Sequence, residues 1–256
     1  MPSVHAYCGL HYGKEYFEWA IASVLPFVDL YHVFYSQWPS HGGSTRMTIP
    51  QGENRETLKY VADSFGTDVV WHDCPRFRHE GEHRTFALNT MFQSYGADLA
   101  VWNDADECWD ADILCNAMDK AIAGQAREYR VHARHLWKGF NWICDDAAMP
   151  VRFVKPTGTG EAYLNDAYFW HFGYAQSAVL VAYKLKIHGH RADIDPNWWK
   201  RVYVDWKPEG SFPQGVHPTN GVDAQTGKPF WTPKPFDKRY IERLVGDHPY
   251  WDEEFV

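Results

Sequence analysis

The chain has 256 residues, of which 45% are hydrophobic, 23% charged and 17% aromatic. This apolar content excludes global disorder, and the length is sufficient for one large domain with a full hydrophobic core. The formal net charge of −8 argues against strong nonspecific binding to nucleic acid, because such binding requires a basic surface that displaces counterions.

The first half of the chain alternates strand-like and helix-like segments. Short apolar runs predict strands at residues 4–8, 30–35, 68–72 and 98–102, and apolar residues at helical spacing predict helices that begin at residue 14, cover 58–65, and run over 82–95 and 110–123. Gly66, Gly96 and Gly124 follow the last three helices as stop signals. Such alternation requires right-handed crossovers and predicts an α/β fold with a mostly parallel sheet flanked by helices.

After about residue 129 this regular alternation stops. We expect one strand at residues 130–137, which leads into loops rich in glycine, proline and tryptophan, and then one helix near 177–188. A region with frequent proline and glycine follows from 196 to 235, and a short helix is expected at about 237–245. Neither an internal repeat nor a linker is apparent. The chain is therefore predicted to be a single domain, 1–256, with a regular half at 1–128 and an irregular half with a C-terminal extension at 129–256.

The cellular location is predicted from targeting and membrane-spanning signals that the sequence does not contain. The most apolar early stretch, residues 19–35, is interrupted by Pro26, Asp29 and His32, so it falls short of the roughly 18 apolar residues of a membrane span. The first residues lack the basic and apolar regions of a signal peptide, and we expect a cytoplasmic protein without a membrane span. Five scattered cysteines, without any Cys-x-x-Cys pair, predict neither a disulfide framework nor a zinc ribbon.

The most informative segment is the acidic cluster Asn103-Asp104-Ala105-Asp106-Glu107, which directly follows the apolar run 98–102. Open parallel sheets bind ligands beyond the carboxyl ends of their strands, which is where this cluster is expected. Three carboxylates within four residues repel one another, and a hard divalent cation such as Mg²⁺ or Mn²⁺ would compensate their charge. The alternative is a solvated acidic turn before the helix that begins at Asp110, since acidic residues favour helix N-termini.

Several segments in the same order resemble family 2-like glycosyltransferases of the GT-A fold. These segments are Arg84-Thr-Phe-Ala-Leu-Asn89, the strand that ends in Asp104-Ala-Asp-Glu107, Trp170-His-Phe-Gly-Tyr-Ala175 with Lys184 and Gly189-His190 downstream, and the N-terminal runs 15–25 and 28–34. The resemblance implies a GT-A-like, Rossmann-type sheet. It assigns residues 1–128 to a nucleotide-sugar-binding half and 129–256 to an acceptor side.

The resemblance also implies roles for particular side chains. Asp106, Asp104 and His171 would hold Mn²⁺ or Mg²⁺, while Asp104, Arg84, Asn89, Lys184 and His190 would bind the nucleotide-diphosphate sugar. Other interpretations remain open at this point. A histidine among aromatic residues can be a hydrogen-bonded core residue, and Arg84 can form a salt bridge with Glu80 or Glu82.

An inverting transferase also needs a base that removes the proton of the acceptor hydroxyl. Four carboxylates precede the His171 motif, namely Asp145, Asp146, Glu161 and Asp166. Asp166 is preferred because it lies nearest to His171 in sequence. The alternative for Asp166 is a loop aspartate whose carboxylate is satisfied by neighbouring backbone amides.

These observations predict a metal-dependent, inverting glycosyltransferase that uses a nucleotide-diphosphate sugar. The acceptor would be a hydroxyl group of a glycan or small molecule, and a hydroxylated DNA base is left open. The competing hypotheses are a glycoside hydrolase and a non-catalytic carbohydrate-binding protein. Four tryptophans, Trp198, Trp199, Trp206 and Trp231, either line an acceptor groove or pack in the core.

Overall fold

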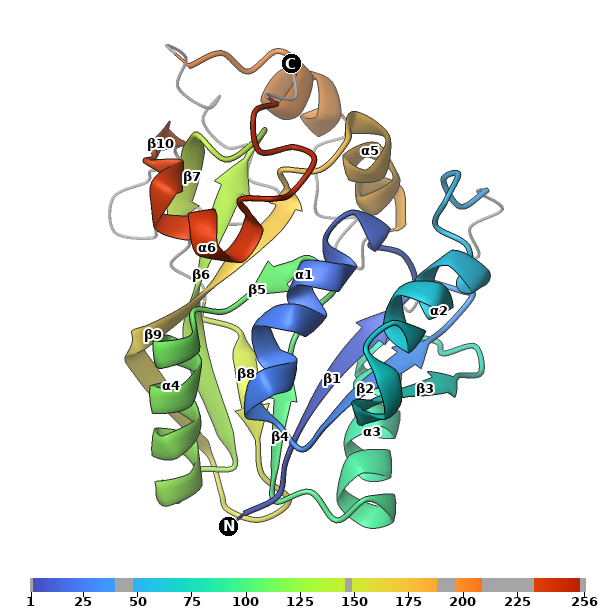
Figure 1. Cartoon of the computed structure of the whole chain (residues 1–256), viewed down its shortest axis with the longest axis vertical. Coiled ribbons are helices and arrows are strands. Elements are labelled where there is room, and N and C mark those ends of the chain that lie inside the picture. The colour runs from blue at the N-terminus through green and yellow to red at the C-terminus, as the bar shows by residue number, and fades with distance from the viewer. Residues whose placement is uncertain (1, 40–47, 146–148, 188–196, 209–232, 254–256) are drawn as a thin grey trace.

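The computed structural model describes residues 2–39, 48–145, 149–187, 197–208 and 233–253. Within this part of the chain one central sheet is flanked by helices, as Figure 1 shows. The sheet has the order β10-β7-β6-β8-β4-β1-β2-β3, and β9 joins it beside β6. The fold is a mixed α/β fold.

The first half follows the predicted alternation closely. Its elements are β1 (Val4–Leu10), α1 (Lys14–Val24), β2 (Leu30–Tyr35), α2 (Arg55–Asp63), β3 (Val69–Asp73), α3 (Glu80–Asn89) and β4 (Leu99–Trp102), with short 3₁₀ turns at Leu25–Phe27 and Gly66–Asp68. The strands β3, β2, β1 and β4 are parallel neighbours. The third helix is shorter than predicted, because its last part, Thr90–Ser94, is a π-helical turn.

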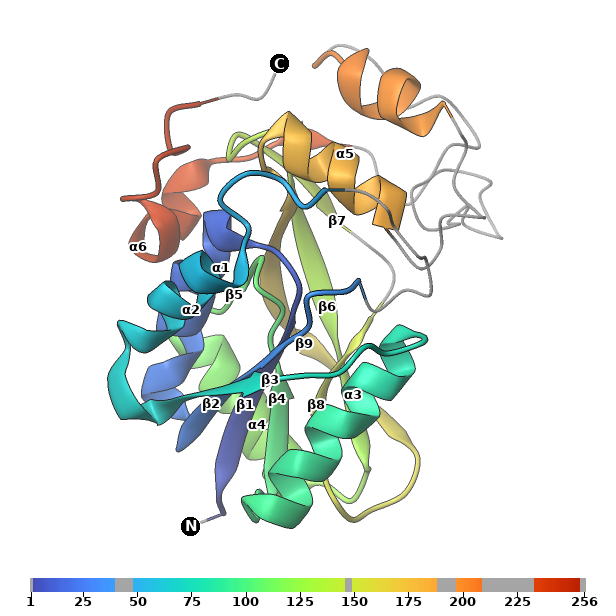
Figure 2. The ribbon, with the colours of Figure 1, turned by 90° about the vertical axis from the view of Figure 1, so that its right-hand side faces the viewer.

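Two layers of helices cover this parallel sheet. Apolar residues of α1, α2 and the later helix α4 (Ala111–Ala123) pack in one cluster, which includes Phe17, Leu58 and Leu114. Ala87 and Met91, on α3 and its π-helical turn, pack in another cluster against Tyr7 and other strand residues that point to the opposite face. Figure 2 shows α3 on the side of the sheet opposite to α1 and α2.

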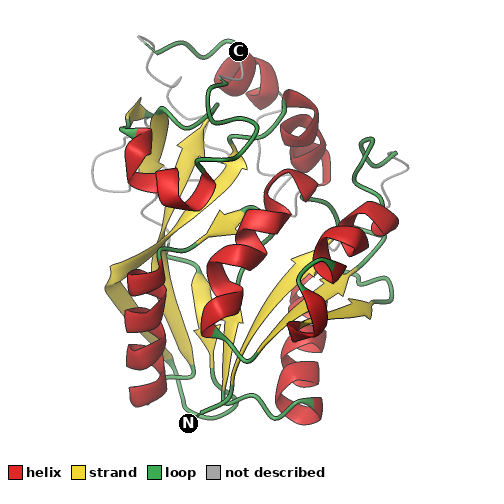
Figure 3. Ribbon diagram, viewed as in Figure 1, coloured by secondary structure: helices red, strands yellow, loops and turns green. Residues whose placement is uncertain are grey.

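The second half contains more regular structure than the sequence predicted. It consists of β5 (Glu107–Cys108), β6 (Glu128–Trp137), β7 (Trp142–Asp145), β8 (Val151–Val154), β9 (Glu161–Tyr174), α5 (Ala178–Ile187), a π-helical turn (Trp199–Val204), β10 (Lys234–Pro235), a 3₁₀ turn (Lys238–Ile241) and α6 (Glu242–Val245). In Figure 3 the long strands β6 and β9 run from the lower part of the sheet to its upper part, where β7 and β10 lie. The expectation of loops before the His171 motif was therefore wrong, since this segment is the 14-residue strand β9.

Aromatic side chains fill the core of this second half. Trp198 is 1% exposed and packs with Trp137 and Tyr203, while Trp199 and Trp206 lie partly buried against the same cluster. Packing is thus the role of Trp198, and Trp231 lies outside the described residues.

Two further expectations concern redox state and membranes. All five cysteines are free, as expected from their scattered positions. Among the helices of the described ranges, none combines the length and the apolar character that crossing a bilayer requires.

Three histidines form a hydrogen-bonded row across β1, β2 and β3, on the face that α3 covers. Nδ1 of His5 lies 2.9 Å from Nε2 of His32, and Nδ1 of His32 lies 3.0 Å from Nε2 of His72. A neutral imidazole has one donor and one acceptor nitrogen, so three neutral rings can each donate to the next along the row. Burial, together with the neighbouring His5 and His72, lowers the pKa of His32 to about 3.

We expect this row to make stability depend on pH. Because the pKa of His32 is lowered in the folded state, the unfolded chain binds more protons below pH 6.5, and the free energy of unfolding falls as the pH is lowered. His32 alone should contribute a loss of about 2 kcal/mol between pH 7 and pH 5. Urea unfolding at both pH values measures this loss. His32→Leu should reduce the difference between the two pH values, and His132→Gln on β6 should leave it unchanged; an equal difference in all three proteins would contradict the explanation.

Candidate functional site

A pocket of about 470 Å³ opens at the carboxyl end of β4. Its charged and polar lining includes five of the side chains singled out in the sequence, Arg84, Asp104, Asp106, His171 and Lys184. They come from α3, from the turn after β4, from β9 and from α5. The pocket lies at the place where open parallel sheets bind their ligands.

The short strand β5 brings the acidic cluster to the later histidine motif. In the antiparallel pair of β5 and β9, Glu107 lies opposite His171, and the amide of Phe172 donates to the carbonyl oxygen of Asp106 at 2.8 Å. Residues 65 positions apart, Asp106 and His171, thereby face the same space. A two-residue strand is too short to leave a hydrophobic pattern, so the sequence did not predict it.

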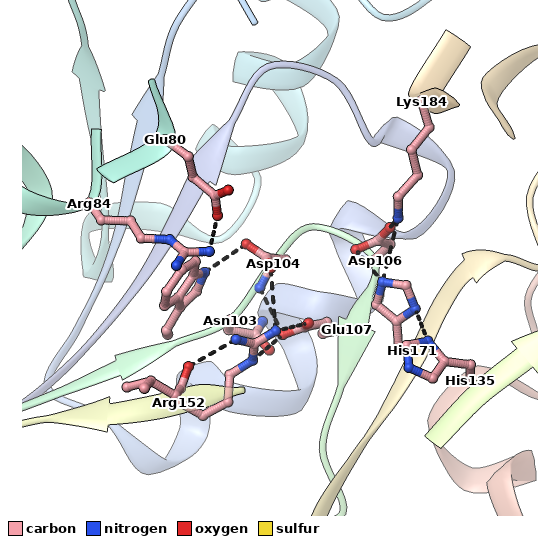
Figure 4. A network of polar contacts seen from close by, with 12 residues as sticks. Glu80, Arg84, Asn103, Asp104, Asp106, Glu107, His135, Arg152, His171 and Lys184 are labelled. Atoms are coloured by element: carbon pink, nitrogen blue, oxygen red, sulfur yellow. Dashed lines mark hydrogen bonds and ion pairs between the residues drawn. The ribbon is translucent and has the colours of Figure 1, made fainter. Parts of the chain in front are cut away.

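Asp106 lies beside Lys184 and His171 (Figure 4), and Gln176 also contacts its carboxylate. Nζ of Lys184 and Nε2 of Gln176 donate to Oδ2 of Asp106, at 3.0 Å and 3.1 Å. Nε2 of His171 lies 3.7 Å from Oδ1. Burial of Asp106 favours its protonated form, but the Lys184 ammonium, the neighbouring His171 and the hydrogen bonds to the carboxylate together outweigh burial and hold the pKa of this carboxyl below its ordinary value. Asp106 is therefore an ionised carboxylate with a positive charge beside it.

His171 is held by a second histidine. Its Nδ1 lies 2.8 Å from Nδ1 of His135, which is its register partner on the neighbouring strand β6. Burial lowers the pKa of His171 well below its ordinary value, so the ring is neutral. If Nδ1 of His171 donates to His135, its Nε2 keeps a lone pair that faces Asp106 and Lys184, a tautomer assigned from this hydrogen-bond geometry.

Asp104 belongs to a different network from Asp106. Its Oδ1 accepts a hydrogen bond from the indole of Trp102 at 2.7 Å, and its Oδ2 lies 3.5 Å from Nη2 of Arg152. Figure 4 shows Asp104 with Arg152 and Glu107, apart from the group that contains Asp106. In the described part of the chain, no three histidine, cysteine or carboxylate side chains converge as a metal site. Of the three expected metal ligands, the structure brings Asp106 and His171 together, whereas Trp102 and Arg152 hold Asp104 in a separate network. The metal-binding role of these residues stays a prediction.

Glu107 anchors the second network from below the pocket surface. Its carboxylate is 1% exposed and accepts from Arg152 Nε at 3.0 Å, from Nη2 of the same guanidinium, and from the amide of Asp104 at 3.2 Å. Burial raises the pKa of Glu107, and the adjacent guanidinium opposes this shift. Glu107 therefore positions Arg152 and the Asp104 backbone and is not itself open to a ligand.

Arg84 forms the salt bridge that was its alternative interpretation and also lines the pocket, while its role in donor binding stays a prediction. Its ion-pair partner is Glu80 on α3, and its guanidinium carbon lies 3.3 Å from the centre of the Trp102 ring, at the pocket wall. Burial lowers the pKa of Arg84 to about 10. Asn89 is exposed and lines a separate shallow groove beside Phe77 and Phe86, so the structure does not bring it to this pocket. His190 lies outside the described residues.

No protein-family model matches the sequence, and no curated protein matches it. Solved structures show distant similarity. Glucosyl-3-phosphoglycerate synthase from Mycobacterium tuberculosis, in complex with Mn²⁺, UDP and phosphoglyceric acid, is 17% identical with a TM-score of 0.37, over 52% of this chain and 43% of that chain. TarS from S. aureus is 10% identical with a TM-score of 0.42, over 79% of this chain and 70% of that one. A mycobacterial protein is 12% identical with a TM-score of 0.42, over 92% and 84%. At such low identities this similarity concerns the fold alone. A function therefore has to be argued from the residues of the site.

The carboxylates expected to act as a base are mostly elsewhere. Asp166 forms an exposed ion pair with Lys120 of α4, and Glu161 forms one with Arg130 of β6; neither lines the pocket. Nearness in sequence was misleading because β9 is extended, and five residues of strand span roughly 16 Å. Asp145 ends β7 and Asp146 lies outside the described residues, so these two remain predictions.

Two further pocket residues, His135 and Arg152, were missed by sequence reasoning, and Glu80 was named only as a salt-bridge partner of Arg84. His135 and Arg152 lie on β6 and β8, and Glu80 lies at the start of α3. None stands in a motif, and each reaches the pocket only through strand pairing or helix docking. The one available signal was the spacing of Glu80 and Arg84, which places them on one helix face.

Proposed function

We propose that the chain is a glycosyltransferase that transfers a sugar from a nucleotide-diphosphate sugar to a hydroxyl group of an acceptor, with inversion. The observation that carries the proposal is the pairing of β5 with β9. It places Asp106 and His171 in one pocket with three cationic side chains, Lys184, Arg84 and Arg152. The GT-A-like resemblance of the sequence motifs and the α/β fold agree with this function.

A divalent cation fits the space between Asp106 and His171. A carboxylate oxygen and a neutral imidazole nitrogen are ligands that Mn²⁺ accepts. Gly173 leaves this space open, since a Cβ there would clash with His171 and Lys184 and lie 2.8 Å from Oδ2 of Asp106. Such a cation would act as a Lewis acid toward the diphosphate that leaves.

The protein's own cations would serve the same leaving group. As the bond to the anomeric carbon breaks, negative charge grows on the diphosphate, and fixed positive groups stabilise that charge. Lys184 offers a flexible ammonium, whereas Arg84 offers a planar fork that suits phosphate oxygens. Asp104, oriented by Trp102 and Arg152, is assigned to the ribose of the donor.

The pocket does not favour glycoside hydrolysis. That reaction requires two carboxyl groups on opposite sides of the scissile bond, one of them protonated. Here each acidic side chain of the pocket has a cationic partner: Asp106 has Lys184, Glu107 and Asp104 share Arg152, and Glu80 has Arg84. Such pairs suit the binding of an anion better than proton donation to a glycosidic oxygen.

The proposal is tested with a panel of nucleotide-diphosphate sugars and Mn²⁺. At saturating concentration a matching donor should raise the thermal midpoint of unfolding, because a ligand that binds only the folded state stabilises it by mass action. The same donor should be hydrolysed slowly, or transferred once an acceptor is added, and chelation of the metal should stop this reaction. If no nucleotide or nucleotide sugar shifts the midpoint, the proposed function is wrong.

Gly173→Ala examines the metal space directly. Gly173 is absent from the glycines with positive φ, so the backbone accepts alanine, and the expected effect is steric. The methyl group should weaken Mn²⁺ binding in the presence of UDP by at least about tenfold, which removes about 1.4 kcal/mol of binding free energy. Electron paramagnetic resonance of free Mn²⁺ measures this, and circular dichroism checks the fold. Unchanged Mn²⁺ affinity in a folded variant would place the metal elsewhere.

A further inference from the structure

A lysine ammonium stands where the proposed cation would bind. Nζ of Lys184 lies 3.0 Å from Oδ2 of Asp106 and 3.5 Å from Nε2 of His171. These two side chains face each other across the space of the proposed cation. Its side chain is only 16% exposed, and Nζ lies 5.3 Å from the centre of the Tyr174 ring. A positive charge is thus built into the site by the chain itself.

We propose that Lys184 competes with the divalent cation for Asp106 and His171, so that metal and nucleotide diphosphate bind as a coupled pair. The inference rests on the proposed function for the identity of the second ligand. The competition itself depends only on the geometry around Lys184. In this proposal, the position of the Lys184 ammonium determines whether the metal can bind.

The competition follows from space and charge. Gly173 leaves room for one group at this point, because even a methyl group there would clash with Nζ of Lys184. A divalent ion that coordinates Asp106 and His171 would lie beside an ammonium of the same sign of charge, which is unfavourable. The ammonium must therefore move away when the ion enters.

The helix that carries Lys184 is fixed, so the movement falls to its side chain. Leu180, Val181 and Tyr183 of α5 are buried, and the amide of Ser177, just before the helix, donates to Glu15 at 2.9 Å. The four-carbon stem of a lysine can swing while its backbone stays in place. Displaced from Asp106, the ammonium needs another anionic partner, and the oxygens of a bound diphosphate would supply it.

Coupling of this kind is reciprocal. If the diphosphate strengthens metal binding by drawing Lys184 away, the metal strengthens diphosphate binding by the same factor. The metal would then be loaded together with the donor and released with the nucleotide product. Free Mn²⁺ alone would occupy the site poorly.

The experiment measures Mn²⁺ binding by electron paramagnetic resonance, with and without UDP. The full chain should bind Mn²⁺ weakly alone and at least about tenfold more tightly with UDP. Lys184→Met, and Lys184→Gln as a second neutral variant, should bind Mn²⁺ alone at least about tenfold more tightly than the unmodified chain, with a smaller gain from UDP. Lys186→Met, an exposed position on the same helix, is the matched control and should behave like the unmodified chain.

The outcomes separate this inference from the proposed function. Equal Mn²⁺ affinities of the unmodified chain and both Lys184 variants without UDP overturn the competition, even if a sugar donor is turned over. Absence of Mn²⁺ binding in every protein overturns it as well. Tighter Mn²⁺ binding by the Lys184 variants supports the competition, even if no nucleotide sugar proves to be a substrate.

Discussion

Asp106→Asn is expected to lower turnover of the nucleotide sugar by at least about a hundredfold while the chain remains folded. The substitution keeps the shape of the side chain and removes the negative charge that Lys184 and the proposed metal share. It also replaces one of the two carboxylate oxygens, which face Lys184, Gln176 and His171, with an amide NH₂ group that can neither accept a hydrogen bond nor bind a cation. A catalytic cation that is weakly held, or held in a wrong position, no longer stabilises the charge that develops on the diphosphate.

The measurement is turnover with the donor found in the panel, at saturating Mn²⁺. Asp119→Asn, on the exposed side of α4, is a matched control that makes the same change of charge far from the pocket. Thermal melting of both variants shows whether the loss comes from unfolding. Near-normal turnover by a folded Asp106→Asn protein would remove Asp106 from the reaction.

The first half of the fold could be predicted because local patterns determine it. Residues 30–35 form an apolar run of the length of a buried strand, and β2 spans those residues. Helix α4 ends before Gly124, which was predicted as its stop signal. In such α/β units each strand and each helix carries its own pattern, and the chirality of crossovers determines how they assemble.

The second half could not be predicted in the same way. Strand β9 runs from an exposed edge into the core, so its burial lacks a regular alternation, and it was interpreted as loop. Strand β8 is only four residues long and reaches the sheet between β4 and β6. Its pairing is a long-range event that leaves no local signal.

The residues of the candidate site also differ in whether local sequence patterns could predict them. Asp106, His171 and Lys184 were predicted from motifs, and strand pairing and helix docking bring them together. Their partners Arg152 and His135 come from distant strands and could not be identified without coordinates. The base was predicted from nearness in sequence, a poor guide along an extended strand, and Asp166 consequently lies on the exposed side of β9.

The buried ion pair of Glu107 and Arg152 lies at the floor of the pocket, and we expect the loss of one partner to lower the free energy of unfolding strongly. The two side chains are 1% and 7% exposed, so neither charge has water to replace a lost partner. Arg152→Met is expected to destabilise the folded state by about 3–5 kcal/mol, because it leaves the Glu107 carboxylate buried without a cation. Urea unfolding at pH 7 measures this loss.

The double variant Glu107→Gln/Arg152→Met is the control for charge. It removes both charges at similar volume, and much of the stability should return, since a neutral pair needs no counter-ion. If the double variant is as unstable as Arg152→Met, the loss does not come from an uncompensated charge.

The pH dependence distinguishes charge from packing. In Arg152→Met, burial without a partner raises the pKa of Glu107 above its value in the unfolded chain. The folded variant then binds more protons than its unfolded chain, so its free energy of unfolding should fall, relative to that of the Glu107→Gln/Arg152→Met double variant, as the pH rises above about 4.3. The guanidinium also lies 4.6 Å from the centre of the Phe169 ring and 5.0 Å from that of Trp102, and its removal costs packing there. An equal difference between the single and the double variant at pH 5 and pH 8 would assign the effect to these ring contacts instead of the buried carboxylate.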